Sequence, residues 1–218
     1  MLPRTTTTPS TASAAPTHPG PSARRRLGAT ALTLALVATA AAACGSGSGP
    51  AVATGSVSCH GVSGSVRFSP PLTAKGTSPE TTTIRVTARG CTASDSSVST
   101  VASASAVATA TSSSNACQGL LTSKGLTFTI HWAPSTITPT VVHYSGYAVS
   151  ASNGKGEFTL PNAGGTATVT GSFAGADHGA RSTAQALSSE SATGLVTACG
   201  SAGGLASIPV TSGSLALR

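Results

Sequence analysis

From residue 56 onward, short stretches alternate apolar residues with Ser or Thr, and Gly, Pro or Asn separates one stretch from the next. A repeat of two residues places neighbouring side chains on opposite faces of a β-strand, so the pattern predicts strands. Thr and Val also fit a pleated, half-buried surface. The clearest stretches are residues 56–68, 81–89, 98–111, 126–132, 140–150, 155–160, 166–173, 180–187, 193–199 and 205–217.

These stretches determine the expected fold class. Asn153-Gly154 suits a type I′ turn and predicts a hairpin between the two stretches that flank it. Residues 180–187 alternate most weakly and could be helical, but nothing else after Cys44 has a convincing helical pattern. About 8–10 short strands in close succession predict an all-β domain, either an antiparallel β-sandwich or a closed up-and-down barrel.

The composition limits the core that such strands can build. The chain has 34 Ser and 34 Thr among 218 residues, and only 3% of its residues are aromatic. Small side chains bury little apolar area each, so a few large ones must anchor the core, and covalent cross-links gain importance. The expected anchors are Phe68, Phe128, Trp132, Phe158 and Phe173.

The formal charge of +7 is concentrated near the N-terminus. Four arginines and no acid lie before Cys44, and from Cys44 onward eight basic residues accompany five acids, a balance of 8 − 5 = +3. The eight are scattered rather than clustered around aromatic residues. A surface that follows nucleic-acid phosphates needs such clusters, so no nucleic-acid partner is expected.

The N-terminal segment has the composition of an export signal. Arg24, Arg25 and Arg26 precede an apolar stretch over residues 27–43 that ends in small residues, as in a secretory signal peptide. The stretch is too short and too rich in Ala and Thr for a permanent span, which requires about 20 strongly apolar residues. Residues 1–43 are therefore interpreted as a disordered extension plus a signal peptide.

Cys44 directly follows three alanines and precedes the Gly/Ser-rich residues 45–50. This arrangement resembles a bacterial lipobox, which implies a diacylglyceryl group on the thiol, cleavage before Cys44 and attachment to the cell membrane. Ala41 departs from the pattern, since Leu is preferred there. The alternative is an ordinary A-x-A cleavage site that releases a secreted protein. With the lipobox interpretation, residues 44–55 form a lipidated linker. Residues 56–218 form a single all-β domain.

The remaining cysteines are even in number, so an exported chain is expected to pair them in disulfides. In an up-and-down meander, Cys59 begins the first strand and Cys91 ends the second, at the same end of the sheet. Cys117 follows the third strand and Cys199 ends the ninth, at the opposite end. A ten-residue strand spans about 33 Å, far more than a disulfide bridges. The predicted pairs are Cys59–Cys91 and Cys117–Cys199, unless a Greek-key crossover changes the parity; a four-cysteine metal site is disfavoured because no C-x-x-C occurs.

Several short motifs together are similar to those of uncharacterised secreted proteins and lipoproteins of actinobacteria. The resemblance covers residues from about Val57 to the C-terminus and implies no particular activity. Its motifs are Cys59, Phe68-Ser69-Pro70-Pro71-Leu72, Gly90-Cys91, Cys117 with Leu120, Ile130-His131-Trp132, Gly171-Ser172-Phe173-Ala174-Gly175 and Cys199-Gly200.

Catalytic patterns are scarce in this chain. No G-x-S-x-G or phosphate-binding motif occurs, and Asp177-His178 is the best acid–imidazole pair, although a glycine-rich loop suggests turn hydrogen bonds instead. His131 and His143 flank a turn and could form half of a metal site, but exposed or packed imidazoles are the favoured interpretation. No catalytic residue, metal or cofactor is expected.

Trp132, Tyr144 and Tyr147 comprise all of the chain's Trp and Tyr and share one expected hairpin. They either pack in its core and rim or form an aromatic patch that binds a glycan, another envelope component or a hydrophobic partner. The leading functional hypothesis is a non-enzymatic, lipid-anchored envelope protein with a structural or binding role. The alternative is a β-barrel carrier of a small apolar ligand, which should contain a continuous inward cavity, and a secreted hydrolase is the third.

Overall fold

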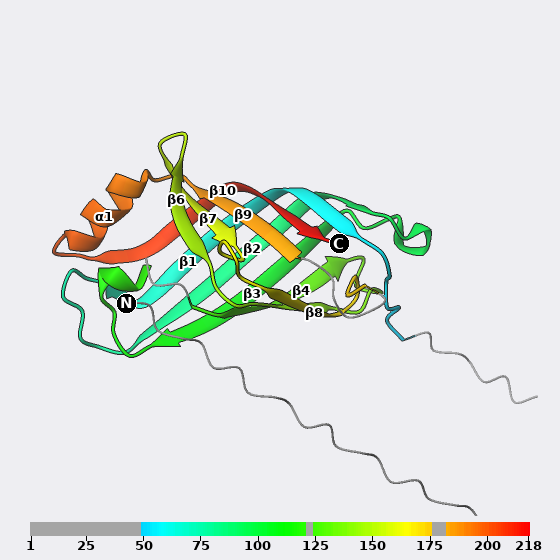
Figure 1. Ribbon diagram of the computed structural model, residues 1–218, viewed down its shortest axis with the longest axis horizontal. Coiled ribbons are helices and arrows are strands. Elements are labelled where there is room, and N and C mark those ends of the chain that lie inside the picture. The colour runs from blue at the N-terminus through cyan, green and yellow to red at the C-terminus, as the bar shows by residue number, and fades with distance from the viewer. Residues whose placement is uncertain (1–48, 121–123, 176–181) are drawn as a thin grey trace, which may run out of the picture. The chain divides into compact units, whose positions relative to one another are not determined.

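The computed structural model describes residues 49–120, 124–175 and 182–218, and within them the fold is all-β, as predicted (Figure 1). Ten strands form one antiparallel sheet rather than two packed sheets. The strands are β1 (Val57–Leu72), β2 (Glu80–Ala93), β3 (Ser103–Ser112), β4 (Leu126–Ala133), β5 (Thr140–Tyr144), β6 (Ala148–Ser152), β7 (Lys155–Leu160), β8 (Ala167–Gly171), β9 (Ser182–Ser188) and β10 (Leu205–Leu217).

The order of the strands is β6-β7-β9-β10-β1-β2-β3-β4-β5-β8. Strands β1 to β5 form the expected up-and-down meander, while the last strand, β10, returns to pair with β1. The β6–β7 hairpin joins the sheet through β9, and β8 pairs with β5. The sheet curls, so that the Tyr144 hydroxyl of β5 lies 2.6 Å from the Ser182 hydroxyl of β9, although these strands are far apart in the strand order.

Short helices occupy the connections. They are α1 (Ala192–Gly200) and the 3-10 helices η1 (Ser96–Val98) and η2 (Cys117–Leu120). The prediction of a strand over residues 193–199 is therefore wrong. Ser191 caps α1 by accepting a hydrogen bond from the Gly194 amide, and Leu195 and Cys199, four residues apart, are its buried residues. By contrast, residues 182–188 of the weakly alternating stretch form β9.

Two other expected strands have different bounds. The stretch 140–150 is divided into β5 and β6, and the stretch 98–111 contributes to β3 only from Ser103. The predicted hairpin at Asn153-Gly154 is confirmed, since β6 and β7 pair directly across it. Asn153 has φ 50° and Gly154 has φ 76°, the left-handed conformations that a type I′ turn requires.

In β2, the alternation of inward and outward side chains shifts by one residue at Gly90. In β2 the inward positions include Ile84, Val86 and Ala88, whereas beyond Gly90 it is Cys91 and Ala93 that pack against the core. Gly90 has φ +60°, a conformation that glycine adopts at little cost. This change keeps apolar side chains on the inside along the whole of the curled strand.

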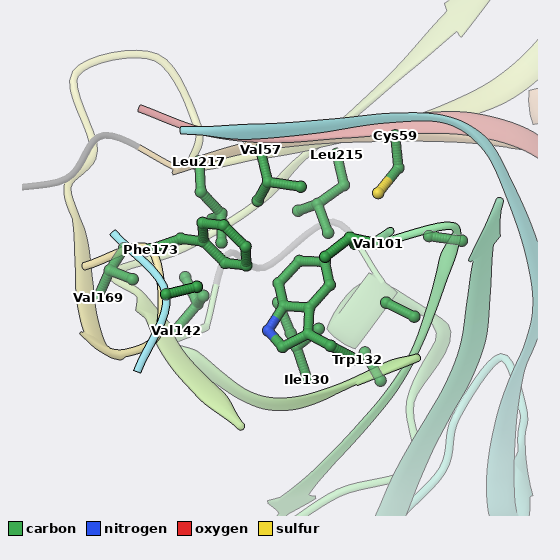
Figure 2. Packing of buried hydrophobic residues seen from close by; sticks show 14 of the residues in the cluster. Val57, Cys59, Val101, Ile130, Trp132, Val142, Val169, Phe173, Leu215 and Leu217 are labelled. Atoms are coloured by element: carbon green, nitrogen blue, oxygen red, sulfur yellow. The ribbon is translucent and has the colours of Figure 1, made fainter. Parts of the chain in front are cut away.

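The buried apolar residues form two clusters. The first contains Trp132 and Phe173, whose rings meet edge to face with centroids 5.0 Å apart, surrounded by residues from β1, β5, β8 and β10 (Figure 2). The second lies where α1 packs on β10 and β7, and includes Phe68, Leu195 and Ile208. The clusters gather at opposite ends of the long strands, because Val57 begins β1 and Leu72 ends it.

The first cluster is closed by hydrogen bonds to the segment that precedes β1. The Trp132 Nε1 atom donates to Thr140 Oγ1 at 2.8 Å, which in turn donates to the Ser172 carbonyl at 2.6 Å. The Ala53 amide donates to Ser172 Oγ at 3.1 Å, and Ala53 is itself buried. Residues 50–54, which the sequence assigns to the linker, are thus already packed against the domain.

The two disulfides are Cys59–Cys91 and Cys117–Cys199, the pairs that the sequence predicts. Cys59 and Cys91 lie directly opposite each other on β1 and β2, as the parity argument requires. The second bridge joins η2 to α1, so Cys199 is held by a helix and not by the strand expected there.

Candidate ligand-binding cavity

A partly enclosed cavity of about 140 Å³ lies inside the curled sheet. Residues of both apolar clusters line it, including Leu126, Ile130 and Tyr144 of the first and Phe68 and Val210 of the second. The cavity therefore separates the two clusters instead of being filled by them. Such a concave, mainly apolar space is typical of a site for a small apolar ligand.

The cavity exists because β3 presents alanines to the interior. Ala104, Ala106 and Ala110 line the cavity, whereas the intervening Val107 points outward and is exposed. Ala106 pairs with Val86 on one side and Ile130 on the other. A methyl group reaches only a short way from the sheet, which leaves space in front of this strand.

The cavity is long and narrow. Its lining residues extend from Glu80 to Ala88 on β2 and from Ala104 to Ser112 on β3. At a rise of about 3.3 Å per residue, each wall runs for about 26 Å. A small volume distributed over this length suits a chain-like molecule better than a compact ring system.

One end of the cavity is polar. Glu80, at the start of β2, pairs in register with Ser112 at the end of β3. Glu80 is only 5% exposed, and its Oε1 atom accepts a hydrogen bond from Thr82 Oγ1 at 2.7 Å. Ser114 and Lys124 line the same end, where a second depression adjoins the cavity.

Two tyrosines line the cavity wall, and the pKa values of their hydroxyl groups reflect how apolar their surroundings are. Burial raises the pKa of Tyr144 to about 12, against the opposing effect of its hydrogen bond with Ser182. The pKa of Tyr147 is raised by burial and, to a smaller extent, by the negative charge of Glu80. The Tyr147 hydroxyl donates to the Gly119 carbonyl at 3.2 Å, close to the polar end. Ionisation of either phenol is thus disfavoured by the apolar surroundings.

The prediction of an exposed aromatic patch is wrong, because two of its three residues are buried. Trp132 and Tyr144 are 3% and 2% exposed because their positions on β4 and β5 face the interior of the curled sheet. Trp132 belongs to the first apolar cluster, while Tyr144 and Tyr147 line the cavity. The three residues therefore form core packing and a cavity wall, not a platform for a glycan at the surface.

The two histidines do not meet across their hairpin. His143 lies opposite Thr127, whose hydroxyl is 2.9 Å from His143 Nδ1, whereas His131 is four residues farther along β4. Both imidazoles are exposed. Among the residues that the structure describes, no group of three or more His, Cys, Asp or Glu could hold a metal ion.

Three candidate site residues, Cys44, Asp177 and His178, lie outside the described residues, as does the expected signal peptide over residues 1–43. In the described part of the chain, no helix has the length and hydropathy needed to traverse a bilayer. Two disulfides in an all-β domain fit an oxidising, extracytoplasmic environment.

Comparison with protein-family models, with curated protein sequences and with solved structures yields no match. The function must therefore be argued from the cavity itself. Sequence reasoning missed Glu80 and the alanines of β3 as site residues. The available signal was the alternation Ala104-Ser105-Ala106, which marks an inward face with unusually small side chains.

Proposed function

We propose that this protein is an extracytoplasmic, lipid-anchored binding protein whose curled sheet encloses an elongated apolar ligand. The observation that carries the proposal is the cavity between the two apolar clusters. The cavity supports the expected carrier role, and the two disulfides support the expected extracytoplasmic location.

The apolar surface of the cavity favours occupation by an apolar ligand. Apolar side chains around an unfilled space lose packing partners, and water in that space finds few hydrogen-bond partners on such a wall. A ligand that fills the space removes apolar area from water at about 25 cal/mol per Å². A long cavity with an alanine wall therefore supports a ligand-binding role rather than a purely structural one.

The proposed anchor is Cys44. Two acyl chains hold a protein stably on a membrane where one does not. Blocking the lipoprotein signal peptidase with globomycin should leave the precursor uncut, and Cys44→Ala should prevent lipidation. Unchanged processing and membrane retention in both experiments would refute the anchor without bearing on the cavity.

Ligand binding can be tested with the elongated apolar dye 1,6-diphenyl-1,3,5-hexatriene. When the purified mature protein is added, the fluorescence of the dye should increase and saturate at about one dye molecule per chain. Long-chain hydrocarbons should displace the dye. The control is the outward substitution Val107→Thr on β3, which should leave the titration unchanged. A folded protein that gives no saturable increase would contradict the binding role.

A further inference from the structure

The cavity lining includes a deeply buried carboxylate that its apolar character does not explain. Among the described residues that line the cavity, Glu80 is the one acid and Lys124 the one base. The Glu80 side chain is only 5% exposed, whereas Lys124 is half-buried. A buried carboxylate in an otherwise apolar wall costs free energy unless hydrogen bonds or a cation compensate it.

The hydrogen bonds of Glu80 are incomplete. A carboxylate can accept about four hydrogen bonds. Among the described residues, the donor to this carboxylate is the Thr82 hydroxyl, which lies on the same face of β2 and bonds Oε1. No buried side-chain oxygen of the described residues lacks a hydrogen-bond partner, so Oε2 is not sealed from solvent and can accept from a donor in the cavity that Glu80 lines.

We propose that the cavity selects amphiphiles that carry a protonated amine at one end of an apolar chain, with Glu80 as the residue that recognises the amine. The inference rests on the proposed function and names the ligand class for the same cavity. The chain would lie along the alanine wall of β3, and the ammonium group would donate to Oε2 at the polar end. A charged donor forms the stronger hydrogen bond to a carboxylate, and the low local dielectric strengthens the attraction.

The same geometry disfavours the two other head groups. An alcohol can donate to Glu80 but brings no charge, so it leaves the carboxylate uncompensated. A fatty acid would place a second carboxylate near Glu80 and would have only the half-buried Lys124 as a favourable partner. Charge complementarity at the buried group thus favours the order amine, alcohol, acid.

The test compares three ligands of one chain length. Decylamine, decanol and decanoate compete at neutral pH, each below its micelle concentration, for the dye bound to the wild-type mature protein. We expect decylamine to bind at least tenfold more tightly than decanol and decanoate to bind least tightly. This measurement requires no variant, so it does not depend on the folding of a mutant.

Variants then assign the preference to Glu80. Glu80→Gln keeps the shape of the side chain but removes its charge, and decylamine and decanol should then bind within about threefold of each other. Glu190→Gln, which makes the same change at an exposed position, should leave the tenfold preference intact. Both proteins should bind the dye itself with wild-type affinity.

Equal affinity for the three ligands, or an amine preference that persists in Glu80→Gln, would overturn the role of Glu80 while the apolar binding function stands. Dye binding without competition from any of the three would overturn the amine class in the same way. Failure of the folded wild-type protein to bind the dye at all would overturn the proposed function and this inference with it.

Discussion

Ala106 offers the sharpest test of whether the cavity is a site or a packing defect. It faces the cavity between Val86 and Ile130, so Ala106→Leu would project three more carbons into open space. Burying them contributes about 2.4 kcal/mol at about 0.8 kcal/mol per carbon. Fixing the leucine rotamer costs about 0.5–1 kcal/mol. We therefore expect the free energy of unfolding to rise by up to about 1.9 kcal/mol.

The matched control is Ala108→Leu, the same substitution two residues along the same strand. Ala108 is 3% exposed but does not line the cavity, so its leucine must displace packed neighbours. Overpacking of this kind lowers stability by about 1–3 kcal/mol. The two variants should therefore change stability in opposite directions in urea unfolding followed by tryptophan fluorescence.

Ligand binding separates the variants a second time. Ala106→Leu occupies the space that the dye would use and should weaken dye binding at least tenfold. Ala108→Leu, where it stays folded, should bind the dye with an affinity near that of the wild type. If Ala106→Leu loses as much stability as Ala108→Leu, or binds the dye normally, the assignment of this space as the ligand site is wrong.

Four further predictions concern stability and ionisation. Tyr144→Phe leaves the buried Ser182 hydroxyl without its phenol partner and should lower the free energy of unfolding by about 1–3 kcal/mol in urea, whereas Tyr147→Phe keeps that pair and should cost less. Absorbance at 295 nm should show little tyrosinate in the native protein at pH 10, the ordinary pKa of tyrosine, because burial raises both phenol pKa values. Since unfolded Tyr144 ionises near pH 10 and the folded residue near 12, its contribution to stability should be present below pH 10 and lost as the pH rises toward 12, and a pH-independent unfolding midpoint over this range would contradict it. Gly154→Ala should cost about 1–2 kcal/mol, since φ is 76° there, and an unchanged melting temperature would count against the type I′ turn.

The period-two alternation was sufficient to predict the strands, because alternation is a local property. Lys155–Leu160 and Leu205–Leu217 have the bounds expected from the sequence. The helix α1 was missed because nine residues rich in Ala and Thr carry little periodicity, and its Ser191 cap and four-residue spacing were the usable signals. The pairing of Cys117 with Cys199 agrees with the parity argument, although one premise of that argument, a ninth strand ending at Cys199, was wrong.

The binding cavity could not be predicted from any single motif. It depends on which strands face each other across the curl, a non-local property that alternation does not encode. Ala106 and Glu80 can be recognised as site residues only when the positions of β2, β3 and the opposite wall are known. The aromatic residues illustrate the same limit, because their grouping on one hairpin was visible in the sequence but their inward direction was not.

The attachment of the chain before β1 has a consequence for cargo exchange. Residues 50–54 bond to the end of the domain where β2 finishes near Asp95, whereas Glu80 lies where β2 begins, about 40 Å away along the strand. Only five residues lie between Cys44 and Pro50, so these two residues can be at most about 20 Å apart. Under the proposed lipidation of Cys44, the tether would join the domain at the end opposite Glu80. A ligand that entered or left through the polar end would then do so at the end of the domain farther from its point of attachment.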